Sequence, residues 1–118
     1  MDANTETLLL RIYTGSLDKI NSTPLYETIV HEAKNFGIAG ATVLRGIMSY
    51  GAHSFIHTAK ILAVSDDLPI IIEMIDEADK INAFVKTIEK YFDNPKHGGL
   101  ITLEKINVIF YKPGNPKD

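Results

Sequence analysis

The hydrophobic positions of Thr7–Thr14 fall on both faces of an extended chain. Leucine and isoleucine at the even positions share one face, while Leu9 and Tyr13 flank Arg11 on the other. A strand that is apolar on both faces is typical of the inside of a sheet, so we expect it to be a central strand. Three further apolar runs predict strands: Ala41–Met48, Pro69–Ile75 and Leu100–Tyr111.

The last of these runs changes the parity of its apolar positions partway along. Ile101 and Leu103 are odd, whereas Val108 and Phe110 are even. Because side chains alternate between the two faces of a strand, the change predicts a β-bulge near residues 104–105.

Two helices are predicted by apolar residues that recur every three or four positions. The first begins with Thr23 as the N-cap and Pro24 in the first helical position, and Gly37 ends it. The second begins at Asp76, whose carboxylate suits a helix N-terminus, and ends before Asn94–Pro95. The apolar positions are Leu25, Ile29, Ala33 and Phe36 in the first helix, and Ile81, Val85, Ile88 and Phe92 in the second.

The order strand, helix, strand, strand, helix, strand predicts an α+β ferredoxin-like sandwich. In this fold an antiparallel sheet carries two helices on one face. The chain of 118 residues is the length of one domain, so we expect residues 1–118 to form a single unit. A long loop is expected at residues 50–68 and a loose tail at residues 113–118.

Composition narrows the classes of function. The formal net charge of −3 argues against general nucleic-acid binding, which usually needs a basic face. Cysteine is absent, which excludes disulfides, thiol catalysis and thiolate metal sites. Met1–Glu6 is polar and carries no basic residue, and no apolar run approaches the ~20 residues that span a bilayer. These features lead us to expect a cytoplasmic protein.

Two groups of residues are candidates for ligand chemistry. His53 and His57 are four positions apart and would share one face of a helix, as metal ligands do, but no third ligand is near in sequence. His97-Gly98-Gly99 lies between the second helix and the last strand. Paired glycines let backbone N–H groups approach a phosphate, although a tight turn into the strand would use the same residues.

The two arginines, Arg11 and Arg45, lie within predicted strands among apolar residues. Each either contacts an anion or forms a salt bridge with Glu73 or Glu104. Gly46 follows Arg45 and thins the strand, so that another group can approach. Since no nucleophile, paired carboxylates or Ser/His/Asp order stands out, the sequence indicates a protein that is not an enzyme.

Four segments, in this order and spacing, resemble the P-II-like signalling proteins, and most closely the uncharacterised, domain-of-unknown-function branch of that superfamily. They are Phe36–Gly46 (FGIAGATVLRG), Tyr50–Gly51, Asp67–Glu73 (DLPIIIE) and Gly99–Glu104 (GLITLE). The resemblance extends from Leu8 to Tyr111, and the phrase GIAGATVLRG is its most specific part.

The resemblance implies a homotrimer that binds adenine nucleotides in clefts between subunits and regulates a partner, for which a membrane transporter is one candidate. It aligns Ala52–Asp67 with the partner-binding T-loop and Lys96–Leu100 with the phosphate-binding B-loop. The implied nucleotide-binding residues are Tyr13, Gly40, Thr42, Arg45, Gly46, His97, Gly98, Gly99, Leu100 and Lys112. The implied partner-binding residues are Tyr50, Gly51, His53, Phe55 and His57.

The chain also departs from the P-II pattern. The lysine of the P-II B-loop is missing, and Lys112 stands where the family has a phosphate-binding arginine. A site with fewer cations favours fewer phosphates, so AMP or ADP is expected rather than ATP. No tyrosine lies between Ala52 and Asp67, and the P-II glutamine has no match, so neither tyrosine nucleotidylation nor 2-oxoglutarate sensing is expected.

Two alternatives share the predicted fold. A trimeric divalent-metal-handling protein of the ion-tolerance type would use His53, His57 and the acidic run at residues 66–79. An acylphosphatase-like hydrolase would need an arginine in a phosphate-cradling loop. Arg11 and Arg45 are instead expected in strands, so the hydrolase ranks last.

Overall fold

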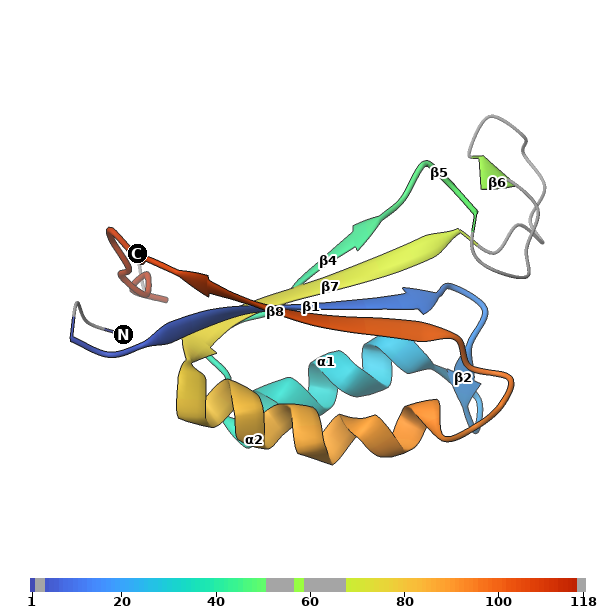
Figure 1. Cartoon of the computed structure of the whole chain (residues 1–118), viewed down its shortest axis with the longest axis horizontal. Helices are drawn as coiled ribbons and strands as arrows, with labels where there is room; N and C mark the ends of the chain where they lie inside the picture. The colour runs from blue at the N-terminus through green and yellow to red at the C-terminus, as the bar shows by residue number, and fades with distance from the viewer. Residues whose placement is uncertain (2–3, 51–56, 59–67, 117–118) are drawn as a thin grey trace.

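The structure, a computed structural model, describes residues 1, 4–50, 57–58 and 68–116. Its main sheet has four antiparallel strands in the order β4-β7-β1-β8. They are β1 (Thr7–Gly15), β4 (Thr42–Arg45), β7 (Pro69–Glu77) and β8 (Gly99–Ile106). The helices α1 (Leu25–Phe36) and α2 (Ala78–Ile88) lie side by side on one face (Figure 1). The predicted ferredoxin-like architecture is therefore confirmed.

Shorter elements complete the chain. A ribbon of β2 (Lys19–Ile20) and β3 (Thr23–Pro24) precedes α1. A second ribbon pairs β5 (Met48–Ser49) with β6 (His57–Thr58), on the side of the sheet away from the helices (Figure 1). The 3₁₀ helix η1 (Glu89–Phe92) continues α2.

The hydrophobic core lies between the helices and the sheet. The even positions of β1 and β7 point into it, and Leu10, Ile12 and Ile72 are completely buried. Phe84 of α2 is also completely buried and meets the ring of Phe36 edge-to-face, with the centroids 5.5 Å apart. Each such side chain contributes about 1.5–3 kcal/mol by leaving water, which makes this face the main source of stability.

Three predicted boundaries are wrong. Strand β8 ends at Ile106 and pairs with β1 in one unbroken register, so there is no bulge at residues 104–105. The change of parity arises because residues 107–111 lie beyond the strand. Thr23–Pro24 forms β3, and Pro24 takes the N-cap position of α1. Asp76 lies inside β7, and α2 starts two residues later.

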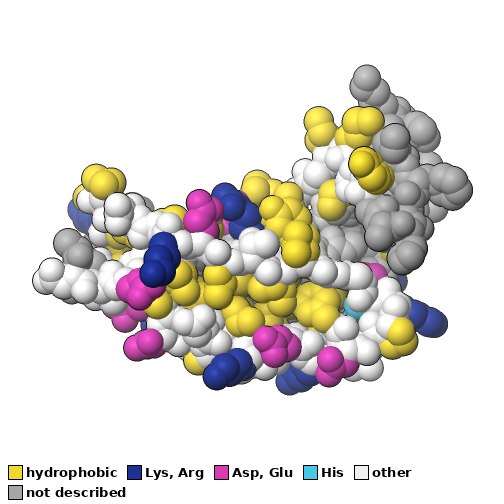
Figure 2. Space-filling view, viewed as in Figure 1, with side chains coloured by type: hydrophobic (Ala, Val, Ile, Leu, Met, Phe, Trp, Pro, Cys, Tyr) yellow, Lys and Arg dark blue, Asp and Glu magenta, His cyan; other side chains and the backbone are white. Residues whose placement is uncertain are grey.

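The face of the sheet away from the helices, here called the open face, is covered by no described helix. Cross-strand register places Leu44, Ile71, Tyr13 and Leu100 in one row across it. Further apolar side chains are exposed over β5 and over the segment after β8, seen at the upper right and upper left of Figure 2. They are Ile47, Met48, Tyr50, Ile109 and Phe110. Surfaces of this kind usually mark interaction sites.

Candidate functional site

The expected nucleotide-binding residues divide between the two edges of the sheet. Arg45 and Gly46 lie on the β4 edge, whereas His97–Leu100 leads into β8 on the opposite edge. Three strand spacings, about 14 Å, separate these edges. Tyr13 lies between them on the open face, opposite Leu100 and Ile71. One chain therefore does not bring the β4 residues and the turn residues together.

The remaining expected residues lie toward the other end of the sheet. Gly40 and Thr42 lie at the start of β4. Lys112 lies beyond the far end of β8. The eight residues of this strand span about 27 Å, so Lys112 is distant from the turn at His97–Gly98. Since Tyr111 shares a cavity with Gly40 and Thr42, the chain after β8 returns to the β4 side at this end.

That cavity has a volume of about 400 Å³ and a mainly apolar wall. Phe110 and Tyr111 supply two aromatic rings, while Thr42 and the Glu73 carboxylate supply polar groups. Cavities of this size and character suit small organic ligands. The remaining wall comes from Met1, Ala39, Gly40, Ala41, Ile75 and Val108.

The turn before β8 is held by several backbone contacts. The His97 amide donates to the Asn94 carbonyl at 2.9 Å, and the Lys96 amide donates to the Asn94 side chain at 2.9 Å. The His97 ring is anchored as well, with Nδ1 2.8 Å from the Tyr91 carbonyl oxygen. Gly98 is exposed, and its N–H makes no hydrogen bond within the described part of the chain. The turn is thus a fixed frame that presents a free backbone donor.

Four glycines of the expected site have different reasons to be glycine. A Cβ at Gly46 would lie 2.4 Å from Cγ of Pro69, and a Cβ at Gly99 would lie 2.4 Å from the Phe92 ring. These two permit close packing within the chain itself. A Cβ at Gly40 or Gly98 would meet nothing within 4 Å. Neither packing nor a positive φ requires these two glycines, which leaves their backbones open to a ligand.

The two arginines have different surroundings. Nε of Arg11 lies 2.9 Å from the Glu73 carboxylate and Nη1 lies 3.3 Å from that of Glu104. The hydrogen bond to Glu73 is the main reason that the pKa of Arg11 is raised. Arg11 thus has the salt-bridge role considered from the sequence. Arg45 is exposed at the free edge of β4 and has no polar partner among the described residues, so it is the cation available to an anion.

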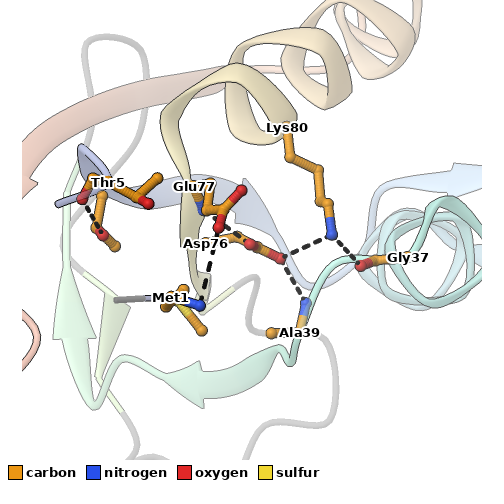
Figure 3. Close-up of polar contacts among 8 residues, drawn as sticks. Met1, Thr5, Gly37, Ala39, Asp76, Glu77 and Lys80 are labelled. Atoms are coloured by element: carbon orange, nitrogen blue, oxygen red, sulfur yellow. Dashed lines mark hydrogen bonds and ion pairs between the residues drawn. The ribbon is translucent and has the colours of Figure 1, made fainter. Parts of the chain in front are cut away.

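A buried carboxylate holds the loop that leads into β4 (Figure 3). Asp76 is 3% exposed, and its Oδ2 accepts the amide of Ala39 at 2.8 Å. Its Oδ1 accepts the amide of Glu77 at 2.7 Å. Lys80 lies 3.7 Å from Asp76 and donates to the Gly37 carbonyl at 3.1 Å. These contacts fix residues 37–39 and, through them, the wall of the cavity at Gly40.

Sequence reasoning assigned Asp76 to a helix start and, within the acidic run at residues 66–79, to the metal-handling alternative. The available signal was parity, because Asp76 shares the even positions of β7 with buried residues such as Met74. A carboxylate at an inward position needs polar partners, and here backbone amides provide them.

The helical layer contributes a second polar contact near the turn. The hydroxyl of Tyr91 in η1 donates a hydrogen bond to the Glu32 carboxylate on α1. Partial burial is the main cause, and this hydrogen bond the second, of the rise in the pKa of Tyr91 to about 12. Since His97 is anchored to the carbonyl of the same residue, α1 supports the turn through Tyr91.

We expect Tyr91 to destabilise the fold when it ionises. The pKa of Tyr91 is raised in the folded state. The contribution of its protonated hydroxyl to the stability of the fold is therefore complete below pH 10 and is lost as the pH rises toward 12. The Tyr91→Phe variant, about 1 kcal/mol less stable at neutral pH, should lose less stability over that interval. Urea unfolding from pH 9 to 12 measures both effects. Tyr50→Phe, at an exposed position, is the control, and equal pH profiles for both variants would contradict the assignment.

The expected partner-binding residues are only partly described. Tyr50 is 75% exposed, and the backbone of His57 pairs with Ser49 in the second ribbon. Gly51, His53 and Phe55 lie outside the described residues. Within the parts of the chain that are described, no three His, Asp or Glu side chains are grouped to hold a metal ion. The described helices include none long and apolar enough to cross a membrane.

Comparison with known proteins shows relatives along most of the chain. The model of a family of uncharacterised proteins, DUF190 ("Uncharacterized ACR"), matches residues 7–108. A UPF0166 protein of Aquifex aeolicus (strain VF5) is 39% identical over 102 residues, which is 86% of this chain and 92% of that protein.

Solved structures share the fold at lower identity. CPII of Thiomonas intermedia K12, described as a nitrogen regulatory PII-like protein bound to ADP, AMP and bicarbonate, has a TM-score of 0.63 at 16% identity. The match covers 92% of this chain and 96% of CPII. The divalent ion tolerance protein CutA1 of Ehrlichia chaffeensis has a TM-score of 0.54 at 16% identity, covering 97% and 89%. At such identities the likeness concerns the fold.

Proposed function

The chain belongs to the DUF190 family, and from this starting point we propose that it is a PII-like regulatory protein without enzymatic activity. It binds an adenine nucleotide, AMP or ADP, in clefts between the subunits of a homotrimer. The bound nucleotide changes the affinity of a segment around residues 52–67 for a protein partner in the cytoplasm. A membrane transporter is one candidate for that partner.

The division of the expected site between two sheet edges is the observation that carries this proposal. Among the residues that the structure describes, the Arg45 cation on the β4 edge and the Gly98 amide on the β8 edge have no polar partner. Within one chain these edges are about 14 Å apart, with two strands between them. A ligand that contacts both needs the β4 edge of one copy beside the β8 edge of another. Contacts between unlike edges generate a ring, which closes at three copies in the proposed trimer.

The exposed apolar surface supports an assembled state. The open face has an unbroken apolar row, and Ile109 and Phe110 are 93% and 80% exposed. A closed ring would remove much of this surface from water. The cavity beside Phe110 and Tyr111 would take the planar base of the nucleotide. The aromatic rings would stack on the faces of the base, and the Glu73 carboxylate would accept a hydrogen bond from its amino group.

The small number of cations at the turn supports AMP or ADP as the ligand. Lys96 is the only Lys or Arg within Asn94–Leu100. Each further phosphate adds negative charge to the nucleotide. A site with few cations to pair with that charge gains little affinity from the additional phosphate. Related PII-like structures with ADP and AMP agree with this preference: CPII is described with both nucleotides bound.

The test combines ligand binding with the mass of the particle. We expect AMP or ADP at about 100 times its Kd to stabilise the protein by about 2.7 kcal/mol in thermal melts. Light scattering should give three times the chain mass of 13.1 kDa. The Arg45→Ala variant should bind about tenfold more weakly, because a hydrogen bond between charged groups is lost. Lys86→Ala, which removes an exposed cation from α2, is the matched control. A monomer that ignores all adenine nucleotides would refute the proposal.

A further inference from the structure

The anchored ring of His97 constrains the position of its protons. Nδ1 lies 2.8 Å from the Tyr91 carbonyl oxygen, and a carbonyl only accepts hydrogen bonds. Nδ1 therefore carries a hydrogen in both the neutral and the cationic ring. In the neutral ring Nε2 has a lone pair and no hydrogen, so it is an acceptor. Nε2 becomes a donor only when the ring takes up a second proton.

Next to this acceptor, Nε2 of the neutral ring, the backbone N–H of Gly98 is a hydrogen-bond donor. Gly98 follows directly, its N–H is free among the described residues, and a Cβ there would meet nothing within 4 Å. His97 itself is half-buried, and the Asn94 carbonyl fixes its backbone. Of these two groups, Nε2 joins the Gly98 amide as a donor only when His97 is protonated.

We propose that His97 binds the phosphate of the nucleotide as an imidazolium, so that one proton is taken up when the ligand binds. This inference rests on the proposed nucleotide-binding function. A fully ionised phosphate only accepts hydrogen bonds, so it would meet neutral Nε2 as one acceptor facing another. The protonated ring instead offers a charge-assisted N–H, which is the stronger class of hydrogen bond. Imidazole changes its charge between pH 5 and 8, so the affinity for phosphate should depend on pH in that range.

Charges near the turn are mixed in sign. The ionisable groups of η1 are Glu89, Lys90 and the Tyr91 hydroxyl, which is bound to the Glu32 carboxylate of α1. Nζ of Lys90 lies 5.3 Å from the centroid of the Tyr91 ring. The turn itself adds Asp93 and Lys96, and the segment after β1, whose Thr14 pairs with Gly99, adds Asp18 and Lys19. The contact with Tyr91 is the hydrogen bond that the structure shows for the His97 ring. With Glu89 included, four acids stand against three lysines, so the proton on His97 would add positive charge where a phosphate needs it.

Calorimetry of AMP binding at pH 6 and pH 8 tests the proposal. We expect AMP to bind about tenfold more tightly to the wild-type protein at pH 6, with net proton uptake shown by buffers of different ionisation enthalpy. Adenosine, which lacks the phosphate, should bind equally at both pH values. His97→Gln has a neutral amide donor, and its affinity should change with pH only as the phosphate of AMP itself titrates. His31→Gln, at an exposed position on α1, should behave as the wild type.

A gain of function provides a second arm. His97→Arg places a permanent cation at the turn, so AMP should bind at pH 8 as tightly as it does to the wild type at pH 6. Thermal melts without ligand identify any variant that fails to fold. Identical pH profiles for wild type and His97→Gln, or tighter binding at pH 8, would overturn the role of His97 while nucleotide binding stands. Absence of binding by both AMP and adenosine at either pH would overturn the proposed function as well.

Discussion

Replacing Asp76 by alanine is expected to lower the free energy of unfolding by about 3 kcal/mol. The carboxylate is 3% exposed and accepts the amides of Ala39 and Glu77. Its removal takes the acceptor from the amides of Ala39 and Glu77, and each hydrogen bond to a charged group that is lost costs about 1.5–3 kcal/mol. Lys80 loses its ion pair at the same time. Urea unfolding measures the loss, and hydrogen exchange at the Ala39 amide reports whether the loop opens locally.

Two further variants separate the role of Asp76 from its charge. Asp79→Ala removes an exposed carboxylate three positions later, in the first turn of α2, and should cost at most about 0.5 kcal/mol. Asp76→Asn preserves one acceptor oxygen and should fall between the two. If the alanine variants at positions 76 and 79 were equally stable, the buried contacts of Asp76 would not hold the loop.

Replacing Gly46 by alanine is expected to cost about 2–3 kcal/mol, the second large effect. The new Cβ would lie 2.4 Å from Cγ of Pro69, and the Gly46 amide also donates to the Pro69 carbonyl at 2.8 Å. Because a proline ring has little freedom to turn away, the backbone of β4 or β7 must shift. Gly99→Ala meets the Phe92 ring, which can turn more easily, and should cost about 1–2 kcal/mol.

Gly98→Ala is the matched control for both substitutions. Its Cβ would meet nothing, and its φ lies outside the left-handed region, so stability should change by less than about 0.5 kcal/mol. Thermal and urea unfolding of the three variants tests the order. A Gly98 variant as unstable as the Gly46 variant would show that the turn is packed more tightly than the structure indicates.

The alternation of apolar residues predicted most of the fold. Thr7–Thr14 differs from β1 by one residue, and the buried even positions of β1 and β7 are those that face the helices. Burial of one face determines the alternation of apolar and polar residues, so this alternation can be recognised in the sequence. The predicted bulge in β8 was wrong because the end of a strand also breaks the pattern. Sequence alone does not distinguish a strand that bulges from one that stops.

The candidate site was less accessible to sequence reasoning. The glycines were identified, but their different roles at Gly46 and Gly98 depend on what lies opposite each Cα in space. The partners of Arg11 come from β7 and β8, and its choice of Glu73 and Glu104 follows from strand order. The division of the site between two edges is likewise a property of topology rather than of spacing along the chain.

The contact between Gly46 and Pro69 makes the intervening segment a removable insertion. The chain leaves the sheet at Gly46 and re-enters it at Pro69, where one 2.8 Å hydrogen bond joins the two residues. Buried Leu68 fastens the returning end through its carbonyl, which accepts the amide of Ser16. The register of β4 with β7 therefore does not depend on the length of residues 47–67. We therefore expect insertions and deletions between residues 47 and 67 to leave the pairing of β4 with β7 intact.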